Sequence, residues 1–205
     1  MHPSDFNLQF QNQSTESKIV VSLERISQAF RVLLWQESKE HSLSPLQVQV
    51  LIFILYHRIE QCTVSYLAAE FNLTKATISD TVKALEQKSL ILKTTLEHDT
   101  RSQNLVLTEE GRDTALKNAL FTREIHQPLE KLREEDKESM LRDLLNIIHH
   151  LNQIGIISIQ RMCTLCVHHE SNKNGAAHYC NLLDKPLKIC DLRIDCPEFD
   201  STKQT

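Results

Sequence analysis

The chain has no long uninterrupted apolar run. Its densest apolar stretch, residues 48–56, is far shorter than the roughly 18 residues that a membrane-spanning helix needs. Residues 1–17 are rich in Gln, Asn and Ser and lack the basic and then apolar layout of a signal peptide. We therefore expect a cytoplasmic protein whose N-terminus, residues 1–17, is flexible.

Glycine is scarce, with three residues in a chain of 205. A hydrophobic content of 40% and a charged content of 24% disfavour a disordered chain and fit a helix-rich globule. The sequence contains no glycine-rich phosphate loop, no Ser/His/Asp arrangement and no HExxH motif. We therefore predict that the protein is not an enzyme, and a metal-dependent enzyme is the least supported alternative.

The chain also lacks the excess of basic residues that many nucleic-acid-binding proteins have. Its net charge is −4, and residues 72–101 carry five Lys and Arg side chains against four Asp and Glu. Overall electrostatics therefore does not identify a DNA-binding protein. A DNA-binding function has to be argued from the pattern of residues instead.

Apolar periodicity predicts long helices at both ends of a mainly helical domain over residues 18–155. The first helix spans residues 18–40, and Ser44-Pro45 begins a second, buried helix with a capping residue and a proline at its first position. The last helix begins in the acidic run at residues 134–136. We expect the two long helices to dimerise through two apolar sets: Ile19, Leu23, Ile26 and Phe30 in the first helix, and Leu144, Leu145 and Ile148 in the last. Core packing within one chain is the alternative for the first helix, and the sequence does not separate the two.

Two short helical segments between these ends have the layout of a helix-turn-helix. Residues 64–71 and 75–88 are separated by a turn at residues 72–73, and Thr74 can cap the second helix. Small and hydrogen-bonding side chains on the outer face of the second helix suit entry into a DNA major groove. Taken alone, the same pattern also fits an ordinary amphipathic surface helix. The side chains that we assign to DNA contact in this helix are Thr74, Lys75, Ala76, Thr77, Ser79 and Lys83.

The apolar period changes to two after Ser89, which predicts a β-hairpin wing. We expect strands at residues 90–96 and 105–107 and a polar tip at residues 97–104. Thr108 can then cap a long helix, which Pro128 should break or kink.

The order of these elements resembles the MarR family of bacterial regulators. The resemblance rests on Asp99 and Arg101 in the wing, an Asp-x-Arg element, and on residues 107–111 (Leu-Thr-Glu-Glu-Gly) at the entry to the next helix. It implies a triangular dimer with one winged helix in each subunit, a recognition helix in the major groove, and a wing arginine, here Arg101, in the minor groove or on its phosphates. Asp99 would orient that arginine. The chain differs from the family pattern at Asp80, and at Ser89, where relatives have glycine.

Five of the six cysteines fall in the last 43 residues, and in a reducing cytoplasm such a cluster suggests metal binding. Two cysteines two residues apart, completed by two distant ones, are typical of a tetrahedral zinc site. An iron–sulfur cluster, unconnected thiols, or substitution by His168, His169 or His178 remain open. A resemblance to MarR-type regulators with a segment ending in Asp-Cys-Pro-Glu makes Cys190 the variable member. The predicted ligands are Cys163, Cys166, Cys180 and Cys196.

The sequence therefore predicts a winged helix-turn-helix with a small β-hairpin wing, long dimerisation helices and a small cysteine-rich module at residues 156–205. The function it favours is a transcriptional repressor that binds a pseudo-palindromic site on double-stranded DNA as a homodimer. A small-molecule effector, a metal or an oxidant would change its DNA affinity. The alternative is a docking module that uses the winged helix and the cysteine segment for protein contacts.

Overall fold

The computed structural model describes residues 4–96 and 99–201, with the side chains of residues 96 and 99–102 left out of the description. Its described part is mainly helical. The helices are α1 (Leu8–Gln13), α2 (Thr15–Glu40), α3 (Pro45–Tyr56), α4 (Val64–Glu70), α5 (Lys75–Gln87), α6 (Glu109–Asn118), α7 (Arg123–Glu130) and α8 (Glu134–Gln153). The strands are β1 (Ile91–Leu96), β2 (Asp99–Leu107), β3 (His169–Lys173), β4 (Ala176–Cys180) and β5 (Lys185–Leu187).

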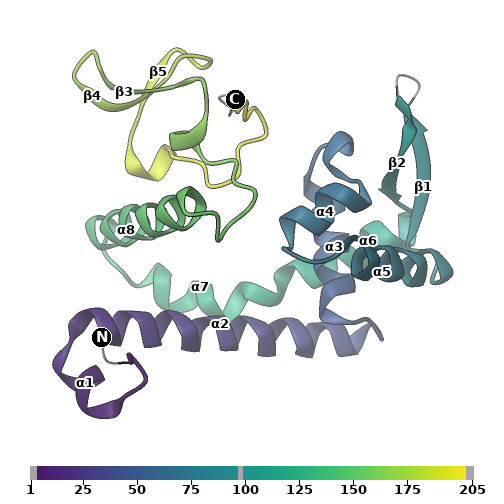
Figure 1. The fold of residues 1–205 in the computed structure, drawn as a ribbon, viewed down its shortest axis with the longest axis horizontal. Coiled ribbons are helices and arrows are strands. Elements are labelled where there is room, and N and C mark those ends of the chain that lie inside the picture. The colour runs from purple at the N-terminus through teal and green to yellow at the C-terminus, as the bar shows by residue number, and fades with distance from the viewer. Residues whose placement is uncertain (1–3, 97–98, 202–205) are drawn as a thin grey trace.

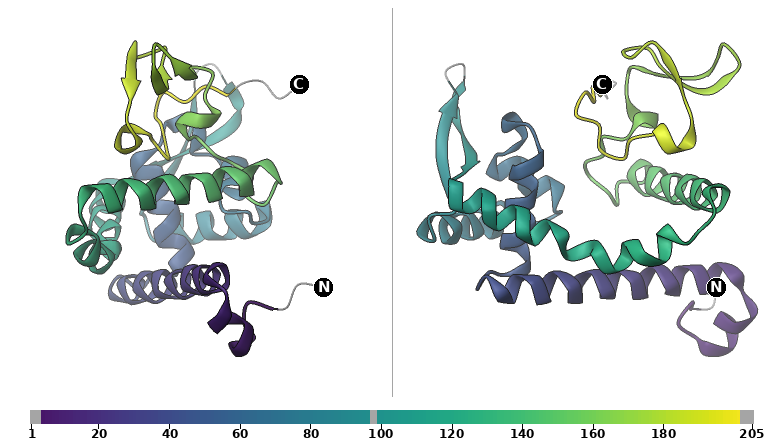
Figure 2. Two further views of the ribbon diagram at one scale, coloured as in Figure 1. Left: turned by 90° about the vertical axis from the view of Figure 1, so that its left-hand side faces the viewer. Right: turned by 180° about the vertical axis from the view of Figure 1, so that it is seen from behind.

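The elements form two bodies joined by long helices (Figure 1). Helices α3 to α6 and the β1–β2 hairpin make a winged helix at one end of the molecule, and α2 and α7 extend away from it (Figures 1 and 2). At the other end the C-terminal segment folds beside α8. None of the helices in the described ranges is long and apolar enough to cross a membrane.

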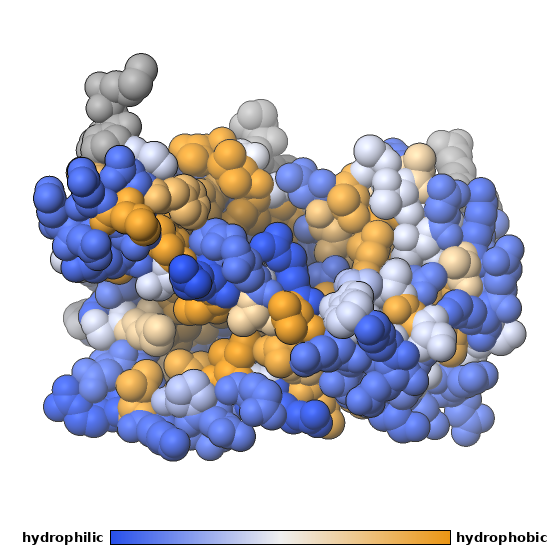
Figure 3. Space-filling view, turned by 90° about the horizontal axis from the view of Figure 1, so that it is seen from below, coloured by the Kyte–Doolittle hydropathy of each residue, from blue (hydrophilic) through white to orange (hydrophobic). Residues whose placement is uncertain are grey.

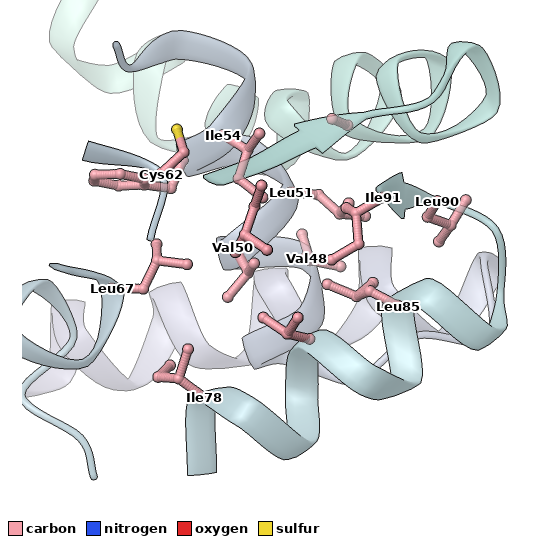
Figure 4. Packing of buried hydrophobic residues seen from close by; sticks show 14 of the residues in the cluster. Val48, Val50, Leu51, Ile54, Cys62, Leu67, Ile78, Leu85, Leu90 and Ile91 are labelled. Atoms are coloured by element: carbon pink, nitrogen blue, oxygen red, sulfur yellow. The ribbon is translucent and has the colours of Figure 1, made fainter. Parts of the chain in front are cut away.

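The core of the winged helix lies between α3, α4, α5 and the wing. Helix α3 begins with a capping box, in which the Ser44 side chain accepts from the Gln47 backbone and the Gln47 side chain accepts from the Ser44 backbone. Ile78 and Leu85 point from α5 toward the α3 side chains (Figure 4) and are fully buried. The buried face of α5 therefore fixes which of its side chains face outward.

The junction between α5, the wing and α6 is tightly packed around Gly111. Ser89 adopts a left-handed conformation with φ of 58°, which explains why glycine also suits this position. The Thr108 hydroxyl donates to the Ser89 carbonyl (2.8 Å) and accepts from the Gly111 backbone N–H (2.9 Å). A Cβ atom at Gly111 would lie 1.8 Å from the Leu90 carbonyl oxygen. Only glycine fits here.

Three elements differ from the sequence-based expectation. Strand β2 begins at Asp99 rather than at residue 105, because its polar residues still pair with β1 through the backbone, as Thr94 does with Asn104. The helix after the wing is interrupted at a 3₁₀ segment, Ala119–Thr122, and Pro128 lies within α7 instead of ending the helix. The N-terminus, expected to be flexible, contains α1, which the Asn7 side chain caps.

The C-terminal segment forms a small module around an antiparallel sheet with strand order β3-β4-β5. Its core consists of Met162, Leu187 and Leu192 packed against Leu145 of α8. Leu145 is 4% exposed, so the expectation that it lies in an interface between chains is wrong. The module covers that face of α8.

Candidate nucleic-acid interface and cysteine cluster

Helix α5 presents the predicted side chains to solvent. Thr74 caps it by accepting a hydrogen bond from the Thr77 backbone N–H (3.1 Å). Thr74, Lys75, Ala76 and Thr77 are exposed, while Ser79 is half-buried. The N-terminal turn of α5 therefore offers hydroxyl groups, a small side chain and one cation on a single accessible surface, which suits contact with base edges and phosphates.

Asp80 also lies on the exposed side of α5. Its carboxylate is 3.6 Å from the Lys83 ammonium, and both side chains are largely exposed. An exposed pair of this kind contributes little stability, but it places a negative charge on the same helix as the predicted phosphate contact. The Asp80 carboxylate therefore partly neutralises the charge of Lys83 in the DNA-free chain.

The wing is held against α5 by a charged contact. Lys93 of β1 lies 2.6 Å from the Glu86 carboxylate of α5, and both side chains are mostly covered. Asp99 and Arg101 lie at the start of β2, next to the hairpin tip. Their side chains fall outside the described part of the structure, so their predicted roles stay predictions.

The arrangement of α4, α5 and the wing can be compared with known proteins. Residues 41–102 match the model of the MarR family. Two solved structures of S. aureus MepR have the same fold: a MepR–DNA complex (25% identical, TM-score 0.55) and MepR in its DNA-binding conformation (25% identical, TM-score 0.57). They match 64% and 65% of this chain and 97% and 98% of their own. A comparison with curated proteins gives no match.

The matches show that the chain has the winged-helix fold of MarR-type regulators. This confirms the predicted mainly helical winged helix-turn-helix, and the proteins it resembles are transcriptional regulators rather than enzymes. The MarR family model ends at residue 102, well before the cysteines of the C-terminal module.

The four predicted metal ligands, Cys163, Cys166, Cys180 and Cys196, line one cavity of about 320 Å³. Cys190, His168 and His169 also line this cavity. Cys190 is the most exposed of the five cysteines, whereas the predicted ligands are half-buried. The fold therefore brings together thiols that are up to 33 positions apart in the sequence.

Polar contacts of the cysteines converge on Arg193. Its backbone N–H donates to the Cys163 sulfur (3.2 Å), and its guanidinium donates to the Cys196 sulfur (3.5 Å). Burial raises the pKa of the Cys163 thiol, and the neighbouring Cys196, Cys180 and Cys166 add to this effect. N–H groups aimed at sulfur favour the thiolate form that a metal needs, but at Cys163 burial outweighs the N–H group of Arg193 and favours the protonated thiol.

The donor set fits zinc in chemistry, because Zn²⁺ is commonly bound by four thiolates. Within residues 4–96 and 99–201, no three His, Cys, Asp or Glu side chains already stand in a metal-binding arrangement. Zinc binding would therefore require these side chains to rearrange. His178 does not line the cavity with them, and its ring instead hydrogen-bonds His169 (3.0 Å).

A buried arginine joins the cysteine module to the winged helix, and the sequence-based reasoning missed it. Arg161 is 5% exposed. Its guanidinium donates to both carboxylate oxygens of Glu70, the last residue of α4, at 2.8 and 3.1 Å, and to the Tyr66 hydroxyl at 2.8 Å. On the module side it donates to both oxygens of Asp195. All of the polar edges of Arg161 are thus engaged, on two separate parts of the fold.

We call the contact of Arg161 with Glu70, Tyr66 and Asp195 the joint. It also includes His57 at the end of α3. The His57 ring lies 3.2 Å from the Asp195 carboxylate and stacks on Phe53 at a centroid distance of 3.7 Å. The hydrogen bond from His57 and the contacts of Arg161 hold the pKa of the Asp195 carboxyl well below its usual range, against the opposing effect of burial. Burial alone would lower the pKa of Arg161, but Asp195 and Glu70 outweigh it and raise this pKa. Arg161 therefore forms ion pairs with two carboxylates, Glu70 of the winged helix and Asp195 of the module.

The remaining cysteine, Cys62, is buried in the core of the winged helix at 1% exposure. Burial and the nearby Glu60 raise the pKa of its thiol to about 11. A protonated and inaccessible thiol is a poor nucleophile. Cys62 is therefore a packing residue and not a reactive one.

Proposed function

We propose that the protein is a DNA-binding transcriptional regulator, a repressor that binds a pseudo-palindromic site as a homodimer. The observation that carries this proposal is the exposed N-terminal turn of α5, displayed beside a wing that Lys93 fixes to the same helix. The likeness to MepR in complex with DNA supports it. Each recognition helix would enter a major groove, and each wing would reach the neighbouring minor groove or its phosphates.

The homodimer is supported by the apolar side chains that one chain leaves uncovered. Ile19, Ile26 and Phe30 of α2 are 50%, 43% and 37% exposed, and Leu120 and Leu129, near and in α7, are 60% and 37% exposed. Apolar side chains gather between polar ones on the face that contains α2 (Figure 3). Contiguous apolar surface of this kind marks an interface. We propose that a second copy of this chain covers it.

The wing provides the first test. Arg101→Ala should weaken binding to double-stranded DNA at least about tenfold, or about 1.4 kcal/mol, because it removes a guanidinium from the minor groove or its phosphates. Fluorescence anisotropy with a labelled duplex at several salt concentrations measures the effect. Arg142→Ala on the exposed side of α8 removes the same charge far from the wing and should leave the affinity unchanged.

Two results would count against this proposal. Equal affinities of wild type and Arg101→Ala at moderate salt would remove the wing from the interface. If the wild-type protein shows no salt-dependent binding to duplex DNA at all, the winged helix serves protein docking instead.

A further inference from the structure

We propose that Cys163, Cys166, Cys180 and Cys196 bind one zinc ion, and that Arg161 transmits the occupancy of this site to helix α4 of the DNA-binding domain. The zinc-loaded protein then binds DNA more tightly than the zinc-free protein. This inference rests on the proposed function, since it names the signal that regulates DNA binding. Three features of the structure lead to it.

The first feature is that two of the proposed zinc ligands share their backbone segments with the joint. Arg161 and Asp195 form an isolated parallel β-bridge, and the Cys196 N–H donates to the Arg161 carbonyl (3.0 Å). Two residues further on, the Cys163 N–H donates to the Arg193 carbonyl (3.0 Å). An ion that holds Cys163 and Cys196 together would therefore also hold Arg161 beside Asp195.

The second feature is the small apolar core of the module. Because this core is small, the fold of the module depends on a cross-link such as a bound metal ion. Four buried residues, Leu145, Met162, Leu187 and Leu192, form this core, and one of them belongs to α8. Modules with so few buried apolar side chains need a metal or disulfides to stay folded. None of the cysteines in the described part of the chain forms a disulfide. Loss of zinc should thus loosen the segment that carries Asp195.

The third feature is the position of Glu70, the partner of the Arg161 guanidinium in the winged helix. Glu70 is the last residue of α4, and four residues separate it from the start of α5. The buried α4 side chains Leu67 and Ala68 share one core with Ile78 of α5. If the Arg161 guanidinium moves away from α4, Glu70 and Tyr66 lose a charged partner in a mostly buried position, which is unfavourable. Helix α4 and the turn before α5 then become less ordered.

The direction of the effect follows from this ordering. A helix-turn-helix that zinc already holds in place binds DNA without a further loss of conformational freedom. The zinc-free protein has to order α4 during binding and so binds more weakly. Coupling between two sites typically changes affinity by a factor of about 5 to 150.

Metal analysis of anaerobically purified full-length protein tests the site itself. We expect colourless protein with one zinc per chain, loss of this zinc in Cys166→Ser, and its retention in Cys190→Ser. Brown protein with iron and acid-labile sulfide would overturn the assignment to zinc. A full complement of zinc in Cys166→Ser would show that the ligands are wrongly chosen.

The coupling is tested by the ratio of DNA affinities of zinc-loaded and chelator-treated protein, measured on the same duplex. In the wild type this ratio should be at least about fivefold. Glu70→Ala should reduce it toward one with zinc content unchanged, because Arg161 then loses its charged partner in α4 and keeps only the Tyr66 hydroxyl there. Glu60→Ala, which removes the same charge from an exposed position just before α4, should keep the wild-type ratio. A ratio near one in the wild type, or equal ratios in wild type and Glu70→Ala, would overturn the proposal.

Hydrogen exchange of residues 64–70 separates this inference from the proposed function. In the wild type without DNA, zinc removal should lower the protection of these amides, and in Glu70→Ala the protection should be low with or without zinc. If this pattern is found but no duplex is bound in either state, the link is present and the DNA-binding function is wrong. If DNA is bound but the protection of the α4 amides is the same with and without zinc, the coupling is wrong and the DNA-binding function stands.

Discussion

Gly111→Ala is expected to destabilise the winged helix by about 3 kcal/mol, the upper end of the usual cost of overpacking. The added Cβ would lie 1.8 Å from the Leu90 carbonyl oxygen and 2.8 Å from its carbon. Both are backbone atoms, so no change of rotamer can relieve the clash, and α6 has to move away from the start of the wing. Urea denaturation monitored by circular dichroism measures the loss.

A matched substitution one residue earlier makes this test specific. Glu110 lies in the same first turn of α6 and is exposed, so Glu110→Ala should change the stability by less than about 0.5 kcal/mol. In an unhindered helix, replacing glycine by alanine stabilises by about 1 kcal/mol. A Gly111→Ala variant as stable as the wild type would therefore contradict the packing at the junction of α5, the wing and α6.

Ile26→Asp should convert the proposed dimer into a monomer. Ile26 is 43% exposed in the single chain, and a second subunit would cover it. The substitution would then bury an unpaired carboxylate, which costs several kcal/mol (roughly 3 or more). Sedimentation velocity at micromolar concentration distinguishes the two states.

Ile26→Leu keeps the apolar volume and should remain dimeric. Because Ile26 is partly exposed in one chain, the aspartate variant should keep its helical circular dichroism, which separates dissociation from unfolding. A wild-type protein that sediments as a monomer, or an Ile26→Asp variant that remains a dimer, would contradict the assignment of this face. Leu145→Asp, by contrast, should release the cysteine module, since Leu145 packs within its own chain.

Local signals in the sequence were sufficient to predict the winged helix. The caps Ser44, Thr74 and Thr108 each fix the start of a helix through contacts within three residues. The period of Ile78, Val82 and Leu85 fixed the inner face of α5, and with it the outer face that carries the DNA-contact candidates. Such signals depend on neighbouring residues only, and so they can be interpreted without the tertiary fold.

The features that the sequence did not reveal depend on contacts between distant segments. Arg161 meets Glu70 across 91 positions and Asp195 across 34, and no local pattern marks any of the three as partners. Leu145 has the apolar spacing of an interface residue, but periodicity shows only that a face is covered, not which segment covers it. The clustering of the cysteines was predicted from their spacing, whereas their attachment to α4 was not.

In the proposed function, the two winged helices of one dimer bind DNA in a sequence-specific manner. The measurement that tests it most directly is selection of bound duplexes from a randomised library with the purified full-length protein, followed by sequencing. We expect enrichment of a pseudo-palindrome whose half-sites lie about one helical turn, or roughly 10 base pairs, apart. Enrichment of no sequence, or of a single unrepeated site, would contradict it.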